Sequence, residues 1–166
     1  ADIIGSWAVQ YLQPLFVPAK TTDDNAVSYS ARGTKYGDVV RTSNRAITTD
    51  RSKNTGGKGQ GVTSTGLYMS ALAVSCSQAV REAAKGMSLD DVRVEVNHNG
   101  DGTFTRLITL YGDLTDDQVE TLRAAGASST VDGYVAKGEI ETTAETASLE
   151  RRRRQNQLHR AERLGK

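Results

Sequence analysis

The sequence LYMSALAVSCSQAVREAA, residues 67–84, predicts the central element of the fold. Apolar and small side chains recur in it at steps of three and four residues, which is the period of one helix face, and alanine, leucine and methionine favour helix. Gly86 is a natural stop for this helix. Cys76, the only cysteine of the chain, lies at its centre. Because glycine, alanine and serine let another backbone approach closely, we expect the helix to be buried and the thiol to be shielded.

Strands are expected before this helix. Alternating side chains between residues 27 and 50 predict a meander of three short strands, with turns at 33–37 and around 43–44. A glycine-rich loop, NTGGKGQG at residues 54–61, then leads into the helix. This loop lacks the spacing of a phosphate-binding loop, so we interpret it as a flexible loop and not as a nucleotide site.

A β-hairpin is expected after the helix. Valines alternate with charged residues over 89–96, the turn cluster NHNGDG follows at 97–102, and the next strand alternates through Phe104, Arg106, Ile108 and Leu110. The turn cluster does not fit an EF-hand loop, and the two histidines of the chain lack the spacing of a metal pair. We therefore expect no metal and no cofactor.

The last predicted elements are a second helix and a final strand. Thr115 caps a helix whose first turn carries two aspartates and which ends near Gly126. Residues 133–143, GYVAKGEIETT, are interpreted as a strand, and residues 145–166 as a charged helix.

Length and composition favour one domain with two extensions. The 166 residues are 37% hydrophobic and only 5% aromatic, which permits a modest aliphatic core. We place an N-terminal extension at 1–26, the domain at 27–143 and a basic C-terminal tail at 144–166. A single cysteine excludes an intrachain disulfide, and neither a secretory segment nor a membrane span is evident, so a cytoplasmic protein is expected.

Charge is divided unevenly along the chain. Residues 151–166 carry seven Lys/Arg against one acid, whereas residues 1–150 carry fourteen against nineteen. Arg151, Arg152, Arg153 and Arg154 form a run that could bind a polyanionic partner such as nucleic acid or anionic lipid. The same run could instead fold back on the acidic body or remain a solvated end.

Residues 28–143 resemble the OsmC/Ohr superfamily of organic hydroperoxide reductases. The resemblance rests on the order and spacing of several weak motifs: a glycine-containing first hairpin, a loop with Asp50, Gly56, Gly57 and Gly61, the ALxxSC pattern that ends at Cys76, and the segments LDDVRVEV, GDLTDDQVETL and GYVAKGEIET. It implies an α+β fold in which antiparallel sheets wrap a long central cysteine-bearing helix, and an intertwined homodimer with active sites at the subunit interface.

The resemblance also implies a chemistry and assigns residues to it. In that family a thiolate on the central helix attacks a peroxide, a second cysteine resolves the sulfenic acid, and an arginine and a glutamate activate the thiolate. Cys76 matches the attacking cysteine, and the arginine falls near Arg32 or Lys35, between which the sequence does not decide. The resolving cysteine falls at Ser129, which cannot form a disulfide. The glutamate falls at Gly66 or Thr65, neither of which is a carboxylate.

Two functions follow from these matches and departures. The first is thiol-dependent reduction of organic hydroperoxides through a single cysteine, with an external thiol as reductant. The second is a catalytically reduced OsmC-like dimer that acts as a binding or assembly module, its basic tail contacting a polyanionic partner. In the second case Cys76 is an inert core thiol, since a free cysteine often behaves as a small hydrophobic residue.

Overall fold

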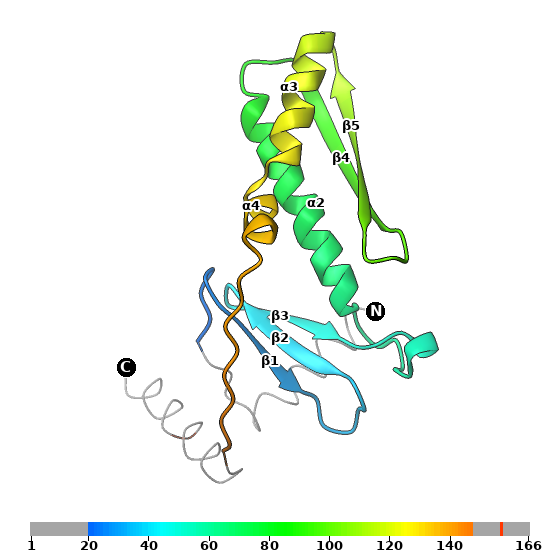
Figure 1. The fold of residues 1–166 in the computed structure, drawn as a ribbon, viewed down its shortest axis with the longest axis vertical. Coiled ribbons are helices and arrows are strands. Elements are labelled where there is room, and N and C mark those ends of the chain that lie inside the picture. The colour runs from blue at the N-terminus through cyan, green and yellow to red at the C-terminus, as the bar shows by residue number, and fades with distance from the viewer. Residues whose placement is uncertain (1–19, 148–156, 158–166) are drawn as a thin grey trace. The chain divides into compact units, whose positions relative to one another are not determined.

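The computed structural model describes residues 20–147 and residue 157, which form two compact units. Thr65–Glu141 make up the second unit, and the described residues on either side of it make up the first. The elements in chain order (Figure 1) are β1 (Ala26–Ser30), β2 (Asp38–Thr42), β3 (Arg45–Thr49), the 3-10 helix η1 (Lys53–Thr55), α2 (Ser64–Ala83), β4 (Leu89–His98), β5 (Phe104–Gly112), α3 (Asp116–Ala127) and α4 (Thr130–Lys137). The predicted α+β class is confirmed.

The first unit contains the predicted meander. Its three strands are antiparallel in the order β1-β2-β3, and Thr42 pairs with Arg45 at the end of the second hairpin. Ser43 and Asn44 form the connecting turn with φ angles of 47° and 57°. A two-residue loop with both residues in the left-handed region suits the right-handed twist of the strands it joins.

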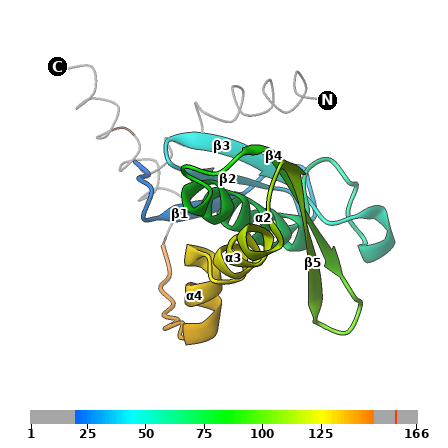
Figure 2. The same cartoon turned by 90° about the horizontal axis from the view of Figure 1, so that it is seen from above.

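The second unit packs two helices against a hairpin. The helices α2 and α3 lie side by side in both views (Figure 1, Figure 2), and β5 contacts α3. In the hairpin, β4 and β5 are antiparallel, from Leu89 opposite Gly112 to His98 opposite Phe104. The predicted cysteine helix and hairpin are thus confirmed. So is the second helix, where Thr115 and Gln118 form a reciprocal capping box.

The core of the second unit is small and lies between these elements. Cys76 and Val80 of α2 and Leu122 of α3 have no exposed surface, and Ala84 is buried beside them. Apolar side chains of the hairpin and its flanking turns pack around this cluster: Met87, Leu89, Val92, Val94, Ile108, Leu110 and Leu114. Alternation along both strands therefore places one face of the hairpin on the core, as the sequence predicted.

The strand predicted at 133–143 is wrong. Residues 130–137 form α4, and residues 138–147 have no regular structure. Local helix signals flank residues 130–137 on both sides. Ser129 stands at the N-cap with Asp132 three residues later, and Gly138 ends the helix in the left-handed region with φ 63°.

Other predictions fall wholly or largely outside the described residues. These are the N-terminal extension at 1–26, of which only residues 20–26 are described, and the charged helix expected over 145–166. The division of the chain at residues 26/27 and 143/144 stays a prediction. Among the described residues no helix is both long and apolar enough to cross a membrane.

The two glycines of α4 test its assignment as a helix. Gly133→Ala should stabilise the protein by about 0.5 to 1 kcal/mol, because alanine favours a helix interior and a methyl group there meets open space. Gly138→Ala should destabilise it by about 1 kcal/mol, because an L residue is strained at positive φ. Urea unfolding of both variants measures the difference, and equal losses at the two positions would contradict the helix.

Candidate active site

Cys76 is enclosed by a close approach of two helices. Gly126 of α3 faces it, and a Cβ atom at that position would lie 2.9 Å from Cys76 Sγ, 2.7 Å from Ile108 Cδ1 and 3.0 Å from Val80 Cγ2. A side chain larger than hydrogen at Gly126 would thus displace α3 or its neighbours. The expectation of a shielded thiol, drawn from the small residues around it, is confirmed.

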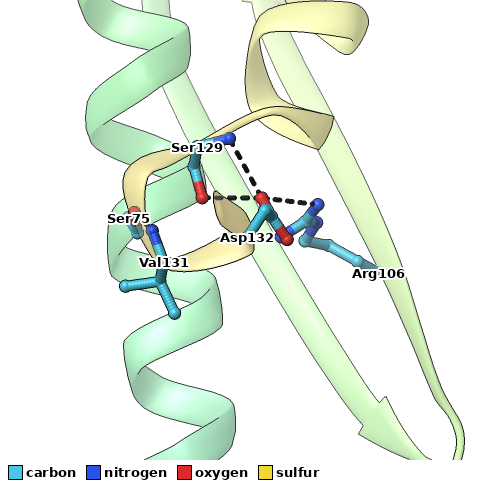
Figure 3. A network of polar contacts seen from close by, with 5 residues as sticks. All are labelled: Ser75, Arg106, Ser129, Val131 and Asp132. Atoms are coloured by element: carbon cyan, nitrogen blue, oxygen red, sulfur yellow. Dashed lines mark hydrogen bonds and ion pairs between the residues drawn. The ribbon is translucent and has the colours of Figure 1, made fainter. Parts of the chain in front are cut away.

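An ion pair lies beside this core, between β5 and α4 (Figure 3). Arg106 donates from Nη1 to Asp132 Oδ1 and from Nη2 to Oδ2, each at 3.2 Å. The side chains are only 19% and 23% exposed. Two parallel bonds between a guanidinium and a carboxylate fix the orientation of both groups.

Ser129 extends the ion pair into the turn between α3 and α4. Its hydroxyl donates to Asp132 Oδ2 at 2.6 Å, and its backbone N–H donates to the same oxygen at 3.0 Å. Ser129 is itself 3% exposed. The hydroxyl at the position matched to a resolving cysteine therefore holds the carboxylate that pairs with Arg106.

A second contact joins the start of α4 to the cysteine helix. The backbone N–H of Val131 donates to Ser75 Oγ at 3.1 Å (Figure 3). Ser75 directly precedes Cys76, so this bond ties the first turn of α4 to the part of α2 that carries the thiol.

The charges of this network act on the thiol in opposite directions. Burial raises the pKa of Cys76 above its ordinary value; the positive charge of Arg106 lowers it, and the negative charge of Asp132 raises it. For Asp132, burial raises the pKa, but hydrogen bonds from Ser129 and the bonds and charge of Arg106 outweigh burial and bring it below the usual range. The thiol is therefore mainly protonated beside an ionised pair.

The two cations matched to the family arginine lie in the first unit. Arg32 and Lys35 are exposed in the connection between β1 and β2, and Lys35 Nζ lies 5.2 Å from the centre of the Tyr36 ring. Their roles toward Cys76 stay a prediction. Within the second unit the cation that acts on the thiol is Arg106.

Sequence reasoning missed the role of Arg106, although a signal was present. Arg106 lies on the same face of β5 as Phe104, Ile108 and Leu110. A charged group on an apolar face is costly to bury unless an opposite charge or a hydrogen bond compensates it. The opposite charge is that of Asp132, 26 residues further on.

Two sets of candidate positions remain. They are the positions matched to the family glutamate and the arginine run of the tail. Thr65 and Gly66 lie in the first turn of α2, which contains no acidic residue, and the Gly66 carbonyl accepts a hydrogen bond from Ser70. The run Arg151–Arg154 lies outside the described residues, so its binding role stays a prediction.

Solved structures share this arrangement of elements. A protein of Psychrobacter arcticus 273-4, described as a proposed osmotic stress induced and detoxification response protein, matches with a TM-score of 0.56 and 18% identity over 70% of this chain and 89% of its own. An OsmC-like protein from Mycoplasma pneumoniae matches with a TM-score of 0.55 and 12% identity over 72% and 89%. The chain has an OsmC-like fold.

The OsmC-like fold confirms the architecture that the sequence motifs implied. The sequence matches no protein-family model and no curated protein. At identities of 18% and 12% the likeness establishes the fold alone.

Proposed function

We propose that this protein belongs to the OsmC/Ohr superfamily and reduces organic hydroperoxides with Cys76 as its sulfur nucleophile. The observation that carries the proposal is the ion pair of Arg106 and Asp132, whose charges act on the thiol of the only cysteine. An inert core thiol needs no charged groups beside it, because two partly buried charges are costly to desolvate. Both the OsmC-like fold and the place of Cys76 on its central helix support this proposal.

The reaction follows from thiol chemistry. The Cys76 thiolate attacks the terminal oxygen of the hydroperoxide, the O–O bond breaks, and the alkoxide leaves and takes a proton as the alcohol. Cys76 then carries a sulfenic acid. Arg106 stabilises the thiolate, whereas Asp132 opposes it and keeps the guanidinium oriented. Because burial also opposes the thiolate, turnover should be slow.

An external thiol must complete the cycle. A first thiol attacks the sulfenic sulfur, releases water and forms a mixed disulfide, and a second thiol releases Cys76 and leaves with the first as a disulfide. Ser129 cannot take the first role, since a hydroxyl forms no disulfide and this one already donates to Asp132. Each hydroperoxide thus consumes two equivalents of external thiol.

A binding module is the second candidate, and the state of the thiol favours it. Cys76 has no exposed surface, and its raised pKa keeps it protonated. In this case the OsmC-like fold would be a scaffold, and Arg151–Arg154 would contact a polyanionic partner. Peroxide consumption equal in wild type and Cys76→Ser would select this candidate.

Substitutions at Cys76 and Arg106 test the peroxidase proposal. Cys76→Ser should reduce thiol-dependent consumption of cumene hydroperoxide to background, because serine is nearly isosteric but forms no thiolate. Arg106→Gln should slow consumption by several-fold, because the cation that favours the thiolate is lost. A coupled assay of thiol oxidation, with dithiothreitol or dihydrolipoate as reductant, measures both.

Arg93→Gln is the matched control for Arg106→Gln. Arg93 lies on β4 of the same hairpin, and its guanidinium is exposed and pairs with Glu95. Consumption by this variant should equal that of wild type. Equal losses in Arg93→Gln and Arg106→Gln would contradict the role assigned to Arg106.

We also propose that the protein is a homodimer. The small second unit leaves large apolar side chains exposed on several elements, among them Val74 of α2 at 53% and Leu107 of β5 at 59%. Large apolar side chains left in water favour burial against a partner. The intertwined dimer implied by the sequence resemblance would cover it.

The solution mass tests the dimer. Light scattering after size exclusion should give twice the chain mass of 17.8 kDa at micromolar concentration. Val74→Lys should shift the protein toward the monomer, because a charge cannot be buried in the interface without a partner, whereas Lys85→Gln, in the turn that follows the same helix, should leave the mass unchanged. A wild-type monomer at micromolar concentration would contradict the proposal.

A further inference from the structure

The glycine-rich loop of the first unit, which we extend to residues 50–61, is built around one buried carboxylate. Asp50 is 6% exposed and accepts hydrogen bonds from the backbone N–H groups of Arg51 at 2.7 Å, Lys58 at 3.0 Å and Gln60 at 3.2 Å. These bonds, with that from Gln60 the largest, outweigh burial and lower the pKa of Asp50. The carboxylate of Asp50 is therefore ionised and bonded to the backbone of the loop.

Two glycines fix the path of this loop. A Cβ atom on Gly57 would collide with the backbone carbonyl of Arg51, and one on Gly61 with that of Thr48. Val62 then bridges to Thr49 beside the sheet. The backbone of the loop consequently has a defined conformation. This backbone fixes the Cα positions from which the lysine and arginine side chains extend.

The loop meets the connection between β1 and β2 at Tyr36. The guanidinium carbon of Arg51 lies 4.0 Å from the centre of the Tyr36 ring, and Lys35 Nζ lies 5.2 Å from it. Gly56 also lies against the ring, since a Cβ there would be 3.6 Å from Tyr36 Cε2. Cation–π attraction thus holds two positive charges near the Tyr36 ring. Tyr36 itself is 37% exposed.

Positive charge is concentrated in this loop and in the connection between β1 and β2. Lys35, Arg51, Lys53 and Lys58 are all exposed, and none forms an ion pair with an acid among the residues that the structure describes. Residues 20–64 carry eight Lys/Arg against four Asp/Glu, whereas residues 65–141 carry six against twelve. We name the surface formed by these four cations and Tyr36 the loop cation surface.

We propose that the loop cation surface binds the phosphate backbone of single-stranded nucleic acid. A small anion held by the backbone of this loop would need free N–H donors, and three of the N–H groups already bond to Asp50. Exposed side-chain cations suit an extended polyanion, and the Arg51 guanidinium matches a phosphate with two parallel donors. The exposed part of Tyr36 adds an aromatic group beside the cations, a combination found on surfaces that bind single strands.

Neutralising two lysines of the loop tests this proposal on the full chain. Lys53→Gln with Lys58→Gln should weaken binding of a fluorescein-labelled 20-nucleotide oligothymidylate several-fold in an anisotropy titration. The slope of log K against log salt should fall by about 1.4, since each phosphate contact on a single strand contributes about 0.7. The side chains of these lysines form no hydrogen bond in the described structure, so the thermal unfolding midpoint should not change.

A matched double variant controls for net charge. Lys85→Gln with Lys137→Gln removes the same charge from the acidic second unit and should leave both affinity and salt slope unchanged. Arg151–Arg154 are present in every variant. A difference in affinity or salt slope between the two double variants is therefore due to the lysines of the loop. The proposal is overturned if the doubles bind equally, if wild type fails to bind at 20 mM salt, or if polyglutamate competes as well as unlabelled oligothymidylate.

Discussion

The ion pair between Arg106 and Asp132 is the interaction on which the candidate site depends. It joins a strand of the hairpin to the last helix, and both side chains are mostly buried. Loss of either partner would leave a mostly buried charge without its counterpart, at a cost of up to about 3 to 5 kcal/mol. The pair also sets the charge around Cys76, because Arg106 favours the thiolate and Asp132 opposes it.

The surrounding structure holds this pair against the cysteine helix. Gly126 allows α3 to approach Cys76 closely, and the chain then turns at Ser129 into α4. Ser129 caps α4 through Asp132, while Val131 bonds to Ser75 on α2. A helix cap, an ion pair and a helix–helix contact are thus linked within the four residues 129–132.

Much of the second unit could be predicted from sequence because its signals are local. The cysteine helix, the hairpin and the Thr115 cap each follow from periodicity or from residues within one turn of one another. The strand predicted at 133–143 is wrong because the Ser129 and Asp132 cap and Gly138 delimit a helix there. Arg106 could be recognised as an inward charge, but its partner could not, since spacing alone does not identify a contact across 26 residues. That Arg32 or Lys35 acts on the Cys76 thiol stays a prediction.

We expect Cys76 to titrate under the opposing charges of Arg106 and Asp132. The rate of alkylation by iodoacetamide as a function of pH, followed by mass spectrometry on wild type and Asp132→Asn, measures this titration because only the thiolate reacts. The wild-type pKa should lie above the ordinary range of a cysteine, and that of Asp132→Asn should be lower, because burial and the arginine remain but the opposing charge is gone. An unshifted wild-type thiol, or the same pKa in both proteins, would contradict this expectation.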